Sequence, residues 1–335
     1  MRVLSLLGPS LPAILATALA AQTPARIADL RQCALASGAR IENCRIGYRT
    51  FGQKNTQGTN VILIPTWLGG TSADWVGLLG PAKIIDTTRY HVIVADALGD
   101  GVSSSPSLTS GFFPQITIGD IVETHYRLAR EVFGITHLRA VVGVSMGGIQ
   151  AFEWAAAHPD FVDRFVSIVG SPEVARHDRA WLLTLVRMID AAETYKIPRD
   201  TVWRMYAGVD VLIDRVQEAV NERSAADADS LLDASAINQS KSFDLADFAV
   251  QSRAILAYHF GKPPRSDSAR MLAGLKGRFL VINSPDDRVI SSGPALSLAR
   301  RIGLDTLVLR SECGHGVFAC EATRIGAAVH AFLER

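Results

Sequence analysis

Ser145 lies at the centre of a sequence pattern that can make a serine hydroxyl nucleophilic. It occupies the middle of Gly143-Val144-Ser145-Met146-Gly147. The apolar run Leu138–Val142 predicts a short buried strand before this turn, and apolar residues at near-helical spacing predict a helix over Gly148–His158. A strand, a G-x-S-x-G turn and a helix are typical of a nucleophile elbow, which raises the serine above the sheet beside a helix N-terminus. The alternative, a glycine-rich turn with an incidental serine, does not account for both flanking patterns.

A serine hydroxyl needs a base to take its proton, and with this kind of turn the chain order is serine, acid, histidine. Of the eight histidines, His315 fits this order best. It follows the strand-like run Thr306–Arg310 and stands between two glycines, which would let a loop carry the imidazole to Ser145. The only later histidine, His330, lies in an amphipathic terminal segment and is predicted to be structural.

The acid is expected after the strand that precedes the histidine's strand. Arg278–Asn283 predicts that strand, and the loop Ser284–Arg288 follows it. The loop contains Asp286 and Asp287, and adjacent side chains cannot both point at one imidazole. Asp287 is our prediction, with Asp286 as the alternative. Its task would be to hold the imidazole in one tautomer and to stabilise the imidazolium.

Two backbone N–H groups are expected to form an oxyanion hole for the acyl oxygen. Met146, directly after the serine, should supply the first. The second should come from the loop Pro65–Gly70, which follows the apolar strand Asn60–Ile64. Leu68 is the predicted donor and Trp67 the alternative; Trp67 is otherwise expected to pack over the acyl pocket.

The elements that must position these side chains alternate between strand and helix up to about residue 172. From 173 to 273 helical patterns replace the alternation, which predicts a helical cap inserted into a mostly parallel α/β core formed by 21–172 and 274–335. Within the predicted cap, Trp181 is a candidate for lining the acyl pocket.

The first twenty residues resemble a leader for export. Met1-Arg2 precedes a broken apolar run, and Ala18-Leu19-Ala20 has the small residues that signal peptidases prefer, so cleavage is predicted after Ala20. Because no stretch approaches the eighteen or more apolar residues of a membrane-spanning helix, no stable span is predicted. The expected location is periplasmic or secreted.

The four cysteines form two local pairs, Cys33–Cys44 and Cys313–Cys320. Four cysteines allow three pairings, and proximity favours these two bonds, which agree with export. A two-residue turn at Gly38-Ala39 is expected to place Cys33 opposite Cys44. The second bond would limit the freedom of the loop that carries His315. Neither pair has the four-ligand pattern of a structural zinc site.

Composition narrows the functional classes. The chain of 335 residues has 34 basic and 33 acidic side chains and a formal charge of +1, which argues against a broad surface for nucleic acid or anionic membranes. It contains no H-E-x-x-H and no Walker motif, so neither a metal nor a cofactor is predicted.

Four stretches of the chain match motifs of one known family: Gly80–Tyr90, Ala97–Gly101, Phe113–Val122, and Ser145–Ala151 with Glu153-Trp154. They resemble the homoserine O-acetyltransferases, whose corresponding signatures include F-P-x-x-T-I-x-D-x-V and S-M-G-G-M-Q-A-x-E-W. The resemblance runs from Arg45 to Ser171 and returns weakly after Arg278. It implies an α/β-hydrolase fold, an acyl-serine intermediate and a triad of Ser145, Asp287 and His315, and it is compatible with a homodimer.

Three positions depart from that family. The aspartate that follows the catalytic histidine there is Gly316 here, and the proline four residues after the acid is Ser291. Arg187 stands near the place of the arginine that binds the amino-acid carboxylate in the family. Homoserine specificity therefore does not follow from the resemblance.

Three functions remain as hypotheses. We favour an exported serine hydrolase that cleaves a small carboxylic ester, because coenzyme A thioesters are cytoplasmic and Gly316 removes an acceptor contact. The alternative is a homoserine O-acetyltransferase-like acyltransferase with an acyl-CoA donor and a hydroxyl acceptor. A non-catalytic binding protein on the same fold is the third hypothesis.

Overall fold

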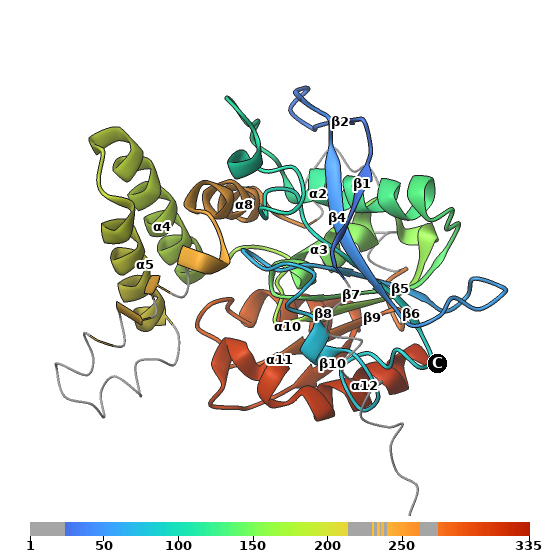
Figure 1. Cartoon of the computed structure of the whole chain (residues 1–335). Helices are drawn as coiled ribbons and strands as arrows, with labels where there is room; N and C mark the ends of the chain where they lie inside the picture. The colour runs from blue at the N-terminus through green and yellow to red at the C-terminus, as the bar shows by residue number, and fades with distance from the viewer. Residues whose placement is uncertain (1–23, 214–229, 231–232, 235, 238–239, 261–273) are drawn as a thin grey trace, which may run out of the picture.

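The computed structural model describes residues 24–213, 230, 233–234, 236–237, 240–260 and 274–335 (Figure 1). The predicted leader, residues 1–20, lies outside the described residues, as does part of the predicted cap. The described chain forms a central sheet with helices on both faces, which confirms the predicted α/β-hydrolase architecture.

The sheet has eight strands in the order β1-β4-β6-β5-β7-β8-β9-β10. The first two are antiparallel to their neighbours, and the other pairings are parallel. Strands β2 and β3 form a separate hairpin. The bounds of the strands are β1 Arg26–Asp29, β2 Gln32–Ala34, β3 Arg40–Glu42, β4 Arg45–Phe51, β5 Val61–Pro65, β6 His91–Ala95, β7 Leu138–Val144, β8 Val162–Ile168, β9 Phe279–Asn283 and β10 Asp305–Val308.

Side chains alternate between two hydrophobic layers because successive residues of a strand point to opposite faces. Val61 and Leu63 of β5 belong to one layer, whereas Ile62 and Ile64 belong to the other. The first layer packs under α2 (Ile118–Arg127), α3 (Met146–Ala157) and α10 (Gly293–Ile302); the second packs against α12 (Ala322–Leu333). Figure 1 shows α2 and α12 on opposite sides of the sheet. Burial on both faces explains why the parallel strands read as continuous apolar runs.

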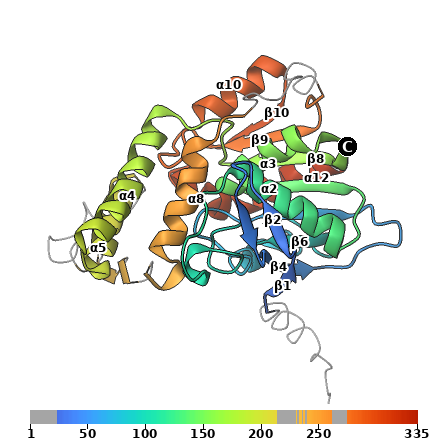
Figure 2. The same cartoon turned by 90° about the horizontal axis from the view of Figure 1, so that it is seen from above.

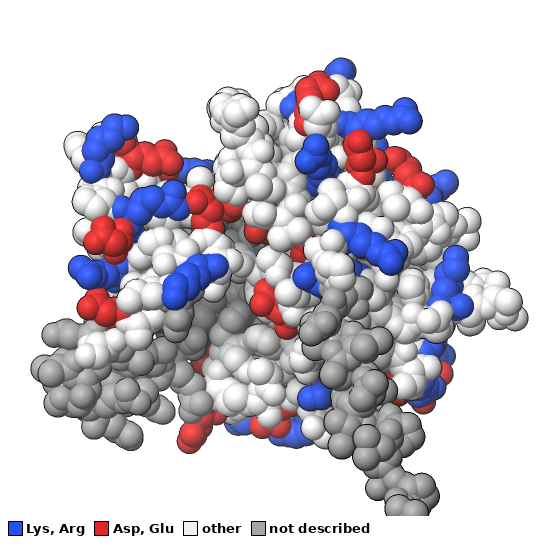
Figure 3. All heavy atoms as spheres, viewed as in Figure 1, with Lys and Arg blue, Asp and Glu red and all other residues white. Residues whose placement is uncertain are grey.

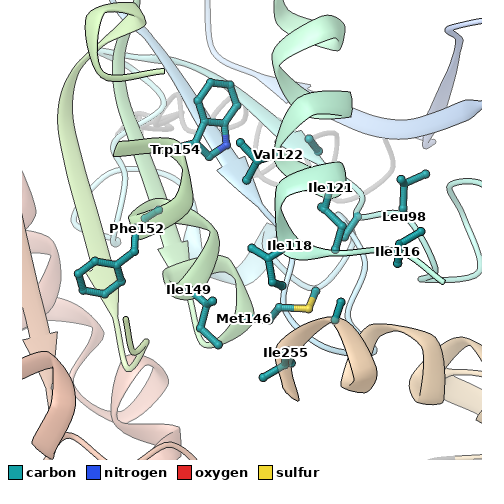
Figure 4. Close-up of a cluster of buried hydrophobic side chains, with 14 of the residues drawn as sticks. Leu98, Ile116, Ile118, Ile121, Val122, Met146, Ile149, Phe152, Trp154 and Ile255 are labelled. Atoms are coloured by element: carbon teal, nitrogen blue, oxygen red, sulfur yellow. The ribbon is translucent and has the colours of Figure 1, made fainter. Parts of the chain in front are cut away.

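Helix α2 begins with a capping box between Thr117 and Asp120 and continues as a π-helical turn, Leu128–Val132. The two pieces together run from Ile118 to Val132 without a break. In Figure 4, Trp154 of α3 lies beside Val122 of α2, and Ile255 of α8 (Leu245–Ala257) lies beside the first turn of α3. Phe152 points away from α2, and its ring stacks on Phe279 of β9 with 4.5 Å between centroids. The helix that follows the serine is thus held by neighbours along its length.

Between β8 and β9 the described chain is helical. It contains α4 (Arg176–Tyr195), α5 (Arg199–Ile213) and α8, and α4 packs against both of the others. Figures 1 and 2 show α8 between the sheet and the outer pair α4 and α5. We call these three helices the helical segment.

The first cysteine pair lies at the N-terminal hairpin. The predicted two-residue turn is wrong, because the loop is Ala36–Gly38 and is closed by the Leu35 N–H, which donates to the Ala39 carbonyl oxygen (2.9 Å). Gly38, at φ +86°, supplies the left-handed residue of such a three-residue loop. Cys33 therefore pairs with Ile41 in the ladder, and Cys44 lies beyond β3. The Cα atoms of Cys33 and Cys44 are nevertheless 5.7 Å apart, at disulfide distance.

The short turn Gly314–Gly316, α11 (Val317–Cys320) and α12 close the C-terminal part of the chain. Short 3-10 helices also cover Val76–Leu78, Pro106–Leu108 and Pro159–Phe161. None of the helices in the described ranges has the length and apolar character to cross a membrane. On the face shown in Figure 3, basic and acidic side chains of the described residues are interspersed.

Candidate functional site

Ser145 stands at a strained turn between β7 and α3. Its backbone has φ 57° and ψ −120°, a region that residues other than glycine rarely adopt. Two glycines permit the turn: a Cβ at Gly143 would lie 2.0 Å from the Gly147 carbonyl oxygen, and one at Gly147 would lie 2.5 Å from the Pro65 carbonyl oxygen. The Ser145 N–H donates to the Ile168 carbonyl oxygen (2.9 Å), which ties the turn to β8.

His315 contacts Ser145 from the loop after β10. Its Nε2 lies 2.9 Å from the Ser145 Oγ, although 170 residues separate the two in the chain. The imidazole is 15% exposed, so it is shielded yet reachable from solvent. In this arrangement a neutral ring with Nε2 unprotonated can accept a hydrogen bond from the serine hydroxyl.

Asp287 holds the other side of the ring. Its Oδ2 lies 2.8 Å from His315 Nδ1, and its side chain is 1% exposed. Its Oδ1 accepts from the N–H groups of Val289 (2.8 Å) and Ile290 (2.9 Å). Asp286 is exposed and accepts from the Ser311 N–H (3.1 Å), so of the two adjacent acids only Asp287 contacts the imidazole.

The loop that carries His315 is fastened at both ends. Asp286 binds its start through Ser311, and Cys313 and Cys320, with Cα atoms 6.5 Å apart, form the second pair at disulfide distance. The bond spans His315 and joins the short turn to α11. The imidazole is therefore presented from a loop with little freedom.

Of the two expected oxyanion donors, Met146 directly follows Ser145 in the chain, and Leu68 borders the same cavities as Ser145. Met146 is the first residue of α3, so its N–H has no intrahelical acceptor. Leu68 follows β5 in a loop that is held by the buried side chain of Gln251 from α8. The Gln251 Oε1 accepts from the Gly69 N–H (3.0 Å), and the Gln251 Nε2 donates to the Leu98 carbonyl oxygen (3.1 Å). Sequence reasoning missed Gln251, since a glutamine in a helix carries no signal of this contact.

Two cavities border Ser145. The small cavity has a volume of about 40 Å³ and is bordered by Ser145, Leu68, Ile149, Trp181, Leu182, Ile255, Val289 and Ile290, with Ser171, Glu173, Val174 and Asp178. The large cavity has a volume of about 190 Å³ and is bordered by Ser145, Trp67, Leu68, Val144, Trp181, Tyr206, Phe248, Val289, His315 and Phe318. Neither set of described lining residues contains a lysine or an arginine.

Helix α4 is fastened to the loop that carries Asp287. The buried Asp178 carboxylate accepts from the N–H (2.9 Å) and Oγ (2.6 Å) of Ser291, and burial raises the pKa of Asp178. Trp181 donates through Nε1 to the Val289 carbonyl oxygen (3.0 Å). The helical segment and Asp287 are therefore joined through a single loop. This loop includes Ser291, which stands where the homoserine O-acetyltransferases have a proline.

Of the other predicted site residues, Trp67 lies at this site and Arg187 does not. Trp67 borders the large cavity and packs against Trp75 and Phe318, with ring centroids 5.6 Å apart in both cases. Arg187 is exposed on α4 and is not among the described lining residues, because six residues after Trp181 a helix has turned to another face.

His125 is fully buried, and burial lowers its pKa to about 4, so it is a neutral structural residue at pH 7.

The fold and this hydrogen-bonded serine define a class of protein. The sequence profile described as the alpha/beta hydrolase fold matches residues 59–319, and the chain belongs to that family. A homoserine O-acetyltransferase from Thermobifida fusca is 27% identical over an alignment of 347 positions, gaps included, which covers 89% of this chain and 90% of that protein. The resemblance found in the sequence motifs is thereby confirmed.

Other relatives cleave esters, according to their names. An ethyl acetate hydrolase from Pseudomonas veronii is 35% identical over 172 residues, covering 50% of this chain and 49% of that protein. The match spans about half the length of such curated esterase relatives. The structure of an acetylester hydrolase from Corynebacterium glutamicum has a TM-score of 0.82 at 26% identity and covers 93% of this chain and 96% of that one. By their names, these relatives are enzymes that cleave esters or transfer acyl groups.

Replacement of the two acids should separate their roles. Asp287→Asn should lower kcat for ester hydrolysis on the order of 10³- to 10⁴-fold, because the imidazole loses its orienting carboxylate. Asp286→Asn should cost less than about tenfold, since the amide oxygen can still accept from Ser311 and the imidazole contact is untouched. Steady-state kinetics on p-nitrophenyl acetate measure both variants. The opposite ranking would move the acid's role to Asp286.

The two cysteine pairs should differ in their effect on turnover. Removing either by a double cysteine-to-serine substitution should cost about 2–3 kcal/mol, because the sequence separations of 11 and 7 residues close loops of similar entropy. Only Cys313→Ser with Cys320→Ser should also lower kcat, since that bond spans His315. Urea unfolding and esterase kinetics test this expectation. An equal loss of kcat in Cys33→Ser with Cys44→Ser would contradict it.

Proposed function

We propose that this protein hydrolyses a carboxylic ester through an acyl-serine intermediate formed on Ser145. The observation that carries the proposal is the continuous hydrogen-bonded chain from Asp287 through His315 to Ser145, which ends between two largely apolar cavities. This arrangement of nucleophile, base and orienting carboxylate is the geometry that acyl transfer to serine requires.

In the first half of the reaction the Ser145 Oγ attacks the carbonyl carbon while its proton passes to His315 Nε2. The oxyanion that forms is stabilised by the N–H groups of Met146 and Leu68, and the α3 N-terminus adds a favourable dipole. The ester C–O bond then breaks, and the imidazolium gives its proton to the departing alkoxide. Asp287 stabilises the positive charge on the imidazole throughout this half.

In the second half a water molecule adds to the acyl carbon. Its proton passes to His315, and collapse of the second oxyanion breaks the bond to the Ser145 Oγ, which recovers the proton from the imidazole. One ester and one water thus give one acid and one alcohol, and the enzyme returns to its starting state.

Hydrolysis is favoured over transfer to homoserine by the charges around the site. Homoserine carries an ammonium and a carboxylate, and burying an unpaired charge costs several kcal/mol. The described lining residues include no lysine or arginine, Asp178 is occupied by Ser291, and Glu173 is paired with His259 (3.1 Å). Gly316 adds no carboxylate beside His315. An apolar ester needs none of these charges.

The second candidate is an O-acyltransferase with an acyl-CoA donor. It is supported by the similarity to homoserine O-acetyltransferases over most of both chains, and it would use the same acyl-serine. The third hypothesis, a non-catalytic binding protein, has less support because the named relatives are enzymes.

We also propose that the protein works in an oxidising compartment, either the periplasm or outside the cell. The two cysteine pairs at disulfide distance support this location, because disulfides persist mainly in such surroundings. The cleavable leader and the homodimer stay predictions.

Ser145→Ala should abolish ester hydrolysis and leave the fold intact, because alanine needs no more backbone strain at this turn than serine does. A fluorophosphonate probe should label the wild type and miss this variant. Ser167→Ala, which removes a buried hydroxyl of β8 outside the hydrogen-bonded chain, is the matched control and should keep its label. Labelling of Ser145→Ala would assign the nucleophile to another residue.

Product analysis should separate hydrolysis from transfer. With p-nitrophenyl acetate or acetyl-CoA as donor and both water and homoserine present, free acetate should exceed O-acetylhomoserine. Gly316→Asp should raise the transferred share, since a Cβ at Gly316 has open space around it and the carboxylate could pair with the amino group. Dominance of O-acetylhomoserine in the wild type would favour the transferase.

A further inference from the structure

Trp181 lies at both of the cavities that border Ser145. It borders both of them, as do Leu68 and Val289. Its Nε1 donates to the Val289 carbonyl oxygen (3.0 Å), and the Val289 N–H in turn donates to Asp287 Oδ1 (2.8 Å). The indole is therefore fixed to the same loop that fixes the acid, so the boundary between the cavities is held in place.

The reaction itself decides which part of the ester occupies which cavity, and this step rests on the proposed function. The imidazolium must deliver its proton to the oxygen of the departing alcohol, so the alcohol lies on the side of His315. His315 borders the large cavity and is not among the described residues that border the small one. The acyl chain therefore enters the small cavity, and the alcohol occupies the large one.

The sizes and linings of the cavities then define the two halves of the substrate. A group of the size of a water molecule needs roughly 10–15 Å³ of cavity volume. The small cavity of about 40 Å³ therefore holds about three carbon groups of the acyl chain beyond the carbonyl carbon. The large cavity of about 190 Å³ is bordered by the rings of Trp67, Tyr206, Phe248 and Phe318. Such a lining favours a flat apolar ring.

We propose that Trp181 determines specificity by separating the two cavities, so that the enzyme takes esters of short acyl groups with bulky apolar or aromatic alcohols. Acyl chains longer than about four carbons would collide with the indole or with the wall formed by Ile149 and Ile255. Removal of the indole would join the two cavities into one.

A reversed pair of isomeric esters tests the orientation. Benzyl acetate carries its ring on the alcohol, and methyl phenylacetate carries the same ring on the acyl group. The wild type should show at least a roughly tenfold higher kcat/KM for benzyl acetate, in line with the cost of an ill-fitting apolar group in a pocket. A preference for methyl phenylacetate would overturn the assignment of the cavities.

A chain-length series tests the role of Trp181. On p-nitrophenyl acetate, butyrate, hexanoate and octanoate the wild type should lose activity beyond butyrate. In Trp181→Ala the ratio of kcat/KM for hexanoate to that for acetate should rise about tenfold or more, with a smaller rise in Trp181→Phe. The matched control is Trp203→Phe, because Trp203 belongs to the same helical segment but packs on Tyr206 and Phe243; its ratio should stay at the wild-type value.

Each ratio compares two substrates on one preparation, so a lower folded fraction in a variant cancels. Equal activity of the wild type on octanoate and acetate, or an unchanged ratio in both Trp181 variants, would refute the role of Trp181 while hydrolysis at Ser145 stands. Absence of any Ser145-dependent ester hydrolysis would instead refute the proposed function.

Discussion

The backbone of Ser145 is held at φ 57°, and the rest of the site depends on this one strained residue. Strain of this kind costs about 1–3 kcal/mol and persists only where the surroundings enforce it. Here β7 ends in the middle of a parallel sheet, α3 starts at once, and Gly143 and Gly147 let the two backbones touch. The packing of α3 against α2, the sheet and α8 keeps the turn from relaxing, so the serine hydroxyl stays in reach of His315.

In the proposed function, the loop after β9 would connect catalysis to substrate selection. Asp287 in this loop orients the imidazole, and the residues just after it receive Trp181 and Asp178 from α4. A movement of α4 would therefore alter the cavity wall and the position of the acid together. The helical segment is the part of the chain in which the sequence motifs of the homoserine O-acetyltransferases are missing. It is in direct contact with the loop that carries Asp287.

Much of the fold and the candidate site followed from local patterns. The apolar runs at Asn60–Ile64 and Leu138–Val142 predicted buried strands, because a strand covered on both faces must be apolar throughout. The glycines around Ser145 predicted a sharp turn, and chain order with flanking glycines singled out His315, the residue that the structure brings to the serine. These inferences succeeded where backbone geometry or burial imposes a residue type at a fixed spacing.

The sequence by itself determined the order of the elements along the chain, the sharp turn at Ser145 and the short list of polar residues able to meet there. It could do so because backbone conformation and burial depend on a few neighbouring residues. Only the tertiary structure decided between Asp286 and Asp287 as the contact of the imidazole, placed Arg187 away from the cavities, and brought Gln251 to the loop of Leu68 from 183 positions along the chain. It also placed Trp181 at the border of both cavities. Contacts between distant segments depend on how the layers pack, and no local spacing in the chain encodes them.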